Sequence, residues 1–415
     1  MSKSWDAVVA GHICLDFIPD LSQIRAGSVG ALLRPGKLIE VGPATLSTGG
    51  AVSNTGLALH KLGIRTRLMG KIGDDLLGRV VRQIVETHGP GLADGMVIDG
   101  SSDTSYTMII NPPRIDRMFL HAPAANNTFG AADIDYDAVA QSRLFHFGYP
   151  PLVRRMFVNG GADLVAMFRR VRELGVTTSL DMALPDPASE AGRVDWAAIL
   201  ASVVPLVDVF LPSIEELLFM LRRSQYDALI REAVDGNLLL LVTDDLLADL
   251  SDELIALGGR VVGIKLGDRG FYLRTADQVR LQAMGAAAPA EPGDWAHREL
   301  WAPCFDVHLV GTTGAGDAAI AGFLAGLLRG LSVKATLRMA VAVGACNVEA
   351  ADALGGIRSW HETEARVAQG WRHYPMPQPS PSWCYDVLYE LWERSDGSRE
   401  CGSGADQRSG IGAVA

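Results

Sequence analysis

The chain has 415 residues, of which 48% are hydrophobic and 20% charged, a composition typical of a globular protein with a sizeable core. Its formal net charge of −11 argues against a broad cationic surface for nucleic acid or for an anionic membrane. The opening MSKSWDAVVAG lacks the apolar core of a signal peptide, and the longest apolar stretch is too short to span a bilayer. We therefore predict a cytoplasmic protein that binds neither nucleic acid nor a membrane.

The first third of the chain contains two strand-rich pieces. We expect WDAVVAGHICLDFI to form the first strand, with its polar end at Asp16. Residues 20–47 are rich in Gly and Pro with short apolar runs, and further on TSYTMII and RMFLHA flank the turn NPPRID like a hairpin. The pieces 17–47 and 104–122 should therefore lie together as a small β lid.

Elsewhere the sequence alternates between strand and helix patterns. STGGAVSNTGLALHKLG predicts a glycine turn that leads into a helix ending at Gly63. From residue 144 to a final helix at 333–351, apolar strands alternate with helices whose apolar residues recur every three or four positions. Alternation over this length predicts a mostly parallel sheet with helices on both faces, which is a three-layer α/β/α sandwich.

The C-terminal part is predicted to add a helical extension. Ser359 and Glu362 have the spacing of a capping box at the start of a helix, and a Pro-rich linker follows that helix. In WCYDVLYELWER, four large apolar residues would share one helical face that docks on the protein: Trp383, Val387, Leu388 and Leu391. We therefore assign residues 363–394 to this extension, and we expect residues 395–415, rich in Gly and Ser, to be disordered.

A glycine-rich turn precedes an apolar helix in LVGTTGAGDAAIAGFLAGLLRG, residues 309–330. Such a turn directs backbone amides toward one point, and the helix dipole adds partial positive charge, which together make an anion hole. Asp317, in the first turn of the helix, could accept a proton from an attacking hydroxyl, or it could only cap the helix. The turn has neither the Lys of a Walker loop nor the GxGxxG spacing of a dinucleotide site.

A second glycine turn, TGGAVSNTG, has the features of a ligand loop. Gly49 and Gly50 allow a backbone to approach a ligand closely, and Asn54 offers a donor and an acceptor to hydroxyl groups. Taken alone, this pattern is more typical of an ordinary helix start.

The histidines and cysteines show no metal-binding spacing. The sequence has no HxxxH, HExxH or CxxC pattern. Four histidines lie in apolar surroundings and are expected to be structural: His12, His60, His146 and His308.

Six segments, in this order, resemble the ribokinase-like carbohydrate kinases of the PfkB family: GGAVSN, KIGDDLLG, DRMFL, LPSIEE, IKLGDRG and GTTGAGDAAIAGFLAGL. The resemblance covers residues 5–362, which we assign as a ribokinase-like kinase domain. It implies transfer of the γ-phosphoryl group of ATP, with Mg²⁺, to a hydroxyl of a sugar or sugar acid. A homodimer that pairs through the lid is a further expectation.

The same resemblance implies roles for individual residues. Asp317 would be the general base, and Gly314, Ala315 and Gly316 would supply the amides of the anion hole. This agrees with the demands of phosphoryl transfer, which needs positioning, charge stabilisation and one proton acceptor. The implied sugar-binding residues are Asp16, Gly49, Gly50, Asn54 and Arg117. The implied nucleotide-binding residues are Lys265, Gly267, Gly270, Thr312, Thr313 and Asn347. Glu216 would organise Mg²⁺ through water.

Three positions depart from the family pattern. Gly311 stands where the family usually has Asp, Ser213 replaces the Asn of an Asn-x-x-Glu motif, and Ala183 follows Asp181 where many members have Asn. Two alternatives therefore stay open beside a sugar kinase. One is a nucleoside kinase of the same family, which a larger apolar pocket under the lid would favour, and the other is a non-catalytic sugar-binding protein on the same fold.

Overall fold

The computed structural model describes residues 3–24, 35–113 and 118–395. In these residues the main sheet has ten strands in the spatial order β15-β16-β14-β13-β12-β11-β10-β9-β1-β4. The strands are β1 (Trp5–Gly11), β4 (Thr66–Met69), β9 (Ser142–Gly148), β10 (Thr177–Leu180), β11 (Val209–Phe210), β12 (Val261–Lys265), β13 (Phe271–Thr275), β14 (Glu299–Ala302), β15 (Trp383–Asp386) and β16 (Leu391–Arg394). In this spatial order, each pair of adjacent strands between β4 and β12 is parallel, and each pair between β12 and β15 is antiparallel. The predicted mostly parallel sheet is confirmed.

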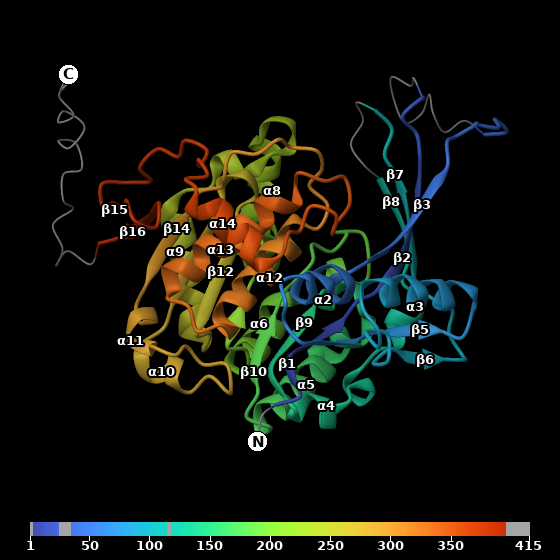
Figure 1. The fold of residues 1–415 in the computed structure, drawn as a ribbon, viewed down its shortest axis with the longest axis horizontal. Helices are drawn as coiled ribbons and strands as arrows, with labels where there is room; N and C mark the ends of the chain where they lie inside the picture. Colours follow the sequence, from blue (N-terminus) through green and yellow to red (C-terminus); the bar gives the residue numbers. More distant parts are fainter. Residues whose placement is uncertain (1–2, 25–34, 114–117, 396–415) are drawn as a thin grey trace.

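Two apolar cores cover the two faces of this sheet. Successive residues of a strand point to opposite faces, so that Ala7 and Val9 of β1 pack in one core and Val8 and Ala10 in the other. The first core also contains residues of α2 (Ala51–Lys61), α3 (Leu76–His88), α12 (Ala315–Leu328) and α13 (Val333–Asn347). The second contains residues of α5 (Ala162–Glu173), α6 (Trp196–Val203), α7 (Ile214–Leu221) and α9 (Asp244–Leu257). The three-layer α/β/α sandwich is therefore confirmed (Figure 1).

Shorter elements complete the described chain. They are the strand pair β5 (Lys71–Gly73) and β6 (Val97–Asp99), and the helices α4 (Tyr136–Ala140), α8 (Arg223–Glu232), α10 (Gln278–Gln282), α11 (Pro292–Trp295) and α14 (Trp360–Ala368). Across residues 3–24, 35–113 and 118–395, no helix combines the length and the apolar character needed to cross a membrane.

The predicted lid is a separate four-stranded sheet that projects from the core (Figure 1). Its order is β3 (Ala44–Gly49), β2 (Cys14–Pro19), β7 (Tyr106–Ile110) and β8 (Met118–Ala122). The prediction of one continuous strand up to Asp16 is wrong, because the chain leaves the main sheet at Gly11. There φ is 130°, and a Cβ atom would lie 2.2 Å from the carbonyl oxygen of Gly148. Asp16 consequently lies on the lid strand β2.

The predicted C-terminal helix is wrong, since residues 383–394 form the hairpin β15–β16 at the edge of the main sheet. Trp383 and Leu391 are fully buried, whereas Val387 and Leu388 are 76% and 75% exposed. The helix-like spacing arises because the two buried residues lie on different strands and the other two lie in the turn between them. The predicted disordered tail, apart from Ser395, lies outside the described residues.

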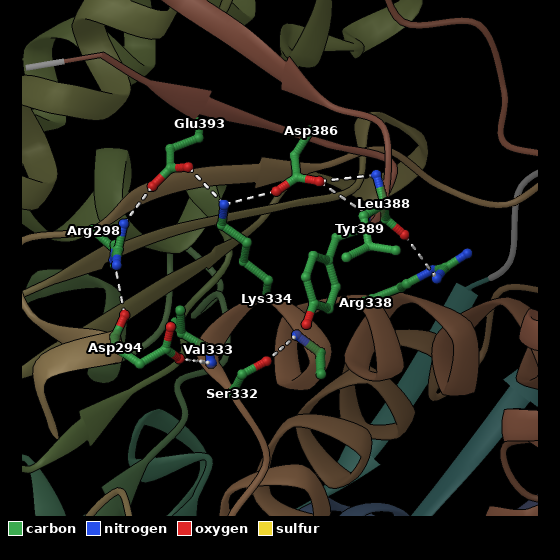
Figure 2. Close-up of polar contacts among 11 residues, drawn as sticks. Asp294, Arg298, Ser332, Val333, Lys334, Arg338, Asp386, Leu388, Tyr389 and Glu393 are labelled. Atoms are coloured by element: carbon green, nitrogen blue, oxygen red, sulfur yellow. Dashed lines mark hydrogen bonds and ion pairs between the residues drawn. The ribbon is translucent and has the colours of Figure 1, made fainter. Parts of the chain in front are cut away.

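Ion pairs attach the hairpin to the rest of the protein (Figure 2). The ammonium of Lys334, in the first turn of α13, contacts Asp386 of β15 and Glu393 of β16, each at 2.7 Å. Glu393 also pairs with Arg298 at 2.7 Å. These side chains are half-buried, so solvent screens them less than a fully exposed pair. The extension is thus an integral part of the main sheet.

Trp383 is predicted to stabilise this arrangement most. Its ring lies 6.2 Å from those of both Tyr272 and Trp301, edge to face, and its indole N–H donates to Asp244 at 3.0 Å. Trp383→Ala should lower the free energy of unfolding by about 3–5 kcal/mol, because it empties a packed core position. Val387→Ala, in the exposed turn, should change it by no more than about 0.5 kcal/mol. Equal urea-denaturation midpoints for the two variants would contradict the docking of the hairpin.

Candidate active site

Polar side chains follow the carboxyl ends of neighbouring parallel strands. His12 follows β1, Tyr149 follows β9, Asp181 follows β10, and Lys265 is the last residue of β12. All four line one cleft of about 1400 Å³ that continues under the lid. Ligands of open α/β sheets bind at this edge, and a typical small-molecule site has about 300–1,000 Å³. The cleft is therefore large enough for two substrates.

Nearly all predicted site residues that the structure describes line this cleft. They are Asp16, Gly49, Gly50, Asn54, Glu216, Lys265, Gly267, Gly270, Thr312, Thr313, Gly314, Ala315, Gly316 and Asp317. Asn347 does not line it, because its side chain is fully buried and its Nδ2 donates to the carbonyl oxygen of Thr313 at 2.8 Å. Asn347 thus supports the glycine loop from behind. Arg117 lies outside the described residues.

The Asp317 carboxylate accepts three hydrogen bonds from two other parts of the chain. Oδ2 accepts from Asn54 Nδ2 at 3.1 Å and from the Tyr149 hydroxyl at 2.7 Å, and Oδ1 accepts from Thr55 Oγ1 at 3.0 Å. Asn54 and Thr55 belong to α2, which packs against α12. A carboxylate has about four acceptor positions, so one remains for an incoming hydroxyl. Gly314, the residue before α12, has no side chain to cap the helix, and the hydrogen bonds described for the Asp317 carboxylate come from side chains outside α12.

The turn before α12 requires glycine at one position. Gly314 has a φ of 71°, and a Cβ atom there would lie 2.7 Å from Cβ of Ala353. This left-handed residue allows Ala315 and Gly316 to begin the helix at the cleft wall. The free amides of a helix N-terminus and its dipole favour a bound anion. The start of α12 therefore lies at the cleft wall next to Asp317, where its backbone amides could bind an anion.

Lys265 lies beside the start of α12. A Cβ atom on Gly316 would lie 3.8 Å from Lys265 Nζ, and this ammonium donates to Asp181 Oδ1 at 2.5 Å. Burial opposes its charge, but the carboxylates of Asp181 and Glu216 outweigh burial and raise the pKa of Lys265. An ammonium in this position could neutralise part of a phosphate bound in the cleft.

Ser213 caps the helix that carries Glu216. The Ser213 hydroxyl accepts a hydrogen bond from the backbone N–H of Glu216 at 3.2 Å. In return, Oε2 of Glu216 accepts one from the backbone N–H of Ser213 at 2.6 Å, so the two residues form a capping box at the start of α7. Ser caps helices about as well as Asn. The departure at Ser213 thus leaves Glu216 in place on the cleft wall.

Under the lid, Asp16 lies against the glycine pair. A Cβ atom on Gly49 would lie 2.3 Å from Asp16 Oδ2, so a larger residue would displace the carboxylate. Burial raises the pKa of Asp16 to about 6. Thr107 of β7 and Asn54 also line this end of the cleft, which therefore offers several groups that can hydrogen-bond to hydroxyls.

Several lining residues are absent from the sequence prediction. Tyr149 could have been found, since it is the last residue of the apolar stretch RLFHFGY and directly follows β9, whose carboxyl end faces the cleft. The C-terminal extension also lines the cleft, with Tyr374, Met376 and Gln378. No sequence pattern indicated that these residues would reach the cleft.

The sequence matches the family described as pfkB family carbohydrate kinase over residues 6–358. The chain therefore belongs to this family, and the predicted enzyme class, a phosphotransferase that acts on a sugar hydroxyl, is confirmed. It is 25% identical over 301 residues to an uncharacterized sugar kinase of Archaeoglobus fulgidus, covering 72% of this chain and 98% of that protein. It is 26% identical over 330 residues to fructokinase-2 of Oryza sativa subsp. japonica, covering 78% and 80% respectively.

Solved structures confirm the ribokinase-like fold. The ribokinase of Arabidopsis thaliana, complexed with ribose and ATP, superposes with a TM-score of 0.62 at 17% identity, covering 88% of this chain and 98% of that one. The nucleoside kinase of Methanocaldococcus jannaschii, an archaeal member of the ribokinase family, superposes with a TM-score of 0.59 at 14% identity, covering 89% and 100%. At these identities the likeness establishes the fold alone.

The conformation of Gly314 leads to a stability prediction. Gly314→Ala should lower the free energy of unfolding by more than about 1 kcal/mol, because alanine is strained at this φ and clashes with Ala353. Gly316→Ala is the matched control, since the nearest heavy atom to its new Cβ would be Cδ of Lys265 at 3.4 Å, an ordinary contact. Two equally stable variants in thermal unfolding would contradict the described turn.

Proposed function

We propose that this protein transfers the γ-phosphoryl group of ATP to a hydroxyl of a small sugar or sugar acid, with Asp317 as the proton acceptor. The observation that carries the proposal is the buried Asp317 carboxylate at the glycine-lined start of α12. It shares one cleft with Asp16 and Asn54 on one side and with Lys265 on the other. This arrangement supports a sugar at the lid end and a nucleotide at the Lys265 end.

ATP is the phosphoryl donor in this proposal. Gly314, Ala315 and Gly316 direct amides toward its phosphates, and Lys265 supplies a positive charge there. The turn from Gly267 to Gly270 borders the nucleotide, together with Thr312 and Thr313. The ATP in the Arabidopsis ribokinase complex supports this donor for a protein of the same fold.

Mg²⁺ is proposed to accompany the nucleotide. Glu216 lines the cleft at 9% exposure, and it would hold the ion through water. Oxygen ligands of this kind suit Mg²⁺, which keeps several waters and binds few carboxylates. When bound, the ion neutralises charge on the phosphates.

The chemical step uses groups that the fold already holds in position. The sugar hydroxyl donates its hydrogen bond to the remaining acceptor position of Asp317, while Asn54 and Tyr149 fix the carboxylate. As the hydroxyl oxygen bonds to the γ-phosphorus, its proton passes to Asp317 and the bond to the β-phosphate oxygen breaks, giving a sugar phosphate and ADP. The amides of the α12 turn stabilise the charge on the transferring group.

A sugar is favoured over a nucleoside as the acceptor. Both relatives compared above have names of sugar kinases, and Asp16, Asn54 and Thr107 offer hydroxyl-binding groups under the lid. The fold does not separate the two classes, since a nucleoside kinase shares it. A screen of sugars, sugar acids and nucleosides for ADP release should therefore yield a sugar or sugar acid. Phosphorylation of nucleosides alone would contradict the proposed substrate class, and the absence of any turnover would favour a non-catalytic binding protein.

The expected oligomeric state and the expected cellular location stay predictions. A homodimer through the lid and a cytoplasmic location are compatible with the fold and follow only from the resemblance and the sequence.

Removal of the Asp317 carboxylate tests the proposed base. Asp317→Asn keeps the size of the side chain but removes proton acceptance, so kcat should fall by about 10²–10⁴-fold. Asp137→Asn is a matched control, because Asp137 also lies in the first turn of a helix, α4, and is exposed. Its kcat should equal that of the wild type. Retention of more than about a tenth of the wild-type kcat by Asp317→Asn, with melting temperatures unchanged, would contradict the assignment.

Asp16 leads to a pH prediction for sugar binding. With a pKa of about 6, Asp16 is ionised at pH 7 and mostly protonated at pH 5, where it no longer accepts two hydroxyls. The KM for the sugar should therefore rise about tenfold from pH 7 to pH 5, if the ionised form binds. Because the pKa of Asp16 is raised in the folded state, its protonation stabilises the folded protein as the pH falls. Acid unfolding caused by Asp16 therefore does not explain the rise in KM.

The control for this effect is Asp16→Asn, which should bind the sugar more weakly at both pH values and lose the pH step. Burial lowers the pKa of the neighbouring His12 to about 3, so that this ring stays neutral throughout the range. A pH step that persists in Asp16→Asn would assign the effect to another group.

A further inference from the structure

His12, Cys14 and His121 form a cluster of potential metal ligands in the sugar end of the cleft. One ring nitrogen of each histidine and Sγ of the cysteine lie within 4.8 Å of one another. His12 follows β1, Cys14 begins β2 and His121 lies in β8, so only the folded lid brings them together. Within the part of the chain that the structure describes, no other three histidine, cysteine or acidic side chains are placed in this way.

We propose that His12, Cys14 and His121 bind Zn²⁺, and that the bound ion excludes the sugar from the cleft. The competition rests on the proposed function, whereas the metal site does not.

The distance between the two rings fits a shared ion better than a hydrogen bond. Nε2 of His12 lies 3.4 Å from Nε2 of His121. Hydrogen bonds from nitrogen typically span about 2.7–3.2 Å. Two nitrogens bound to one tetrahedral zinc at about 2.0–2.1 Å are separated by about 3.4 Å. The two histidines are therefore already spaced as ligands of one ion.

The hydrogen bonds around the rings leave the facing nitrogens available. Nδ1 of His121 lies 3.0 Å from Oγ1 of Thr107, and a proton on Nδ1 leaves Nε2 with its lone pair toward His12. Metal-bound histidines usually donate their other ring N–H in this way. Nδ1 of the buried His12 has no hydrogen-bond partner among the described residues. Among the described residues, Nε2 of His12 has its long polar contact with His121, so this nitrogen is available to an ion.

Cys14 and Asp16 determine which kind of ion fits. Sγ of Cys14 lies 3.3 Å from Oδ1 of Asp16 and 3.4 Å from Oγ1 of Thr107. A thiolate next to a carboxylate would place two negative charges together, which a divalent cation neutralises. Thiolate and imidazole ligands select zinc-like ions over Mg²⁺ and Ca²⁺. This site is therefore chemically distinct from the Mg²⁺ position proposed at Glu216.

The position of the cluster explains the expected competition. His12, Cys14 and His121 line the same end of the cleft as Asp16 and Asn54, the residues proposed to bind the sugar. Three protein ligands leave a fourth zinc position open toward the cleft. An ion held there would occupy the space beside Asp16 that a sugar hydroxyl needs.

Spectroscopic titration of the full-length protein with Co²⁺ tests the site without any activity measurement. Co²⁺ stands in for Zn²⁺, and a thiolate bound to it gives an intense near-ultraviolet charge-transfer band. We expect this band in the wild type and its loss on addition of Zn²⁺. Cys14→Ser should lack the band, and His121→Gln should bind at least about tenfold more weakly, since even the loss of an outer partner costs about 10–100-fold. Cys304→Ser, which removes another free thiol of the same cleft, should keep the band.

Folding of each variant is checked by its thermal unfolding curve. A wild-type protein without the band would overturn the site, as would an unchanged band in folded Cys14→Ser.

Sugar-dependent kinetics test the competition. Zn²⁺ should raise the KM for the sugar with little change in the KM for ATP, and a chelator should reverse the effect. Folded His121→Gln should need at least about tenfold more Zn²⁺ for the same inhibition. A charge-transfer band together with an unchanged sugar KM would overturn the competition. Failure of the proposed kinase activity is recognised separately, since the Co²⁺ band does not depend on turnover.

Discussion

The carboxylate of Asp317 is the contact on which the site depends. It stands at the start of α12, and its hydrogen bonds reach Asn54 and Thr55 on α2 and Tyr149 after β9. The partners come from a helix that packs against α12 and from the end of a central strand, so the carboxylate has a single orientation only when α2, α12 and the sheet are assembled. If Asp317 is the proposed base, this packing would determine where a substrate hydroxyl can react, because proton transfer requires contact within hydrogen-bond reach.

The arrangement also separates two kinds of charge. In the proposed function, Lys265 and the amides of the α12 turn would bind phosphate, while Asp16 and Asp317 would face the sugar; all of them line the same cleft. Buried Asp181 pairs with Lys265 and keeps the ammonium beside Gly316. A reaction that moves a negative phosphoryl group from one side to the other requires this kind of fixed polarity.

The sequence was sufficient to predict the layers, the lid and part of the cleft wall, because periodic apolar patterns and glycine turns report local structure. It did not reveal the break at Gly11 or the hairpin of residues 383–394, since both depend on contacts with distant strands: Gly148 for the first and β14 for the second. The inward packing of Asn347 has the same cause. His12 and Cys14 are close in sequence, but His121 joins them only in space, so no spacing rule could group the three.

A crystal structure with the sugar found by substrate screening and a non-hydrolysable ATP analogue would test the central claim most directly. The account predicts that the reacting hydroxyl oxygen lies within about 3.2 Å of the Asp317 carboxylate and in line with the γ-phosphate at the start of α12. A sugar bound with this hydroxyl facing away from Asp317, or a phosphate bound outside the α12 turn, would contradict it.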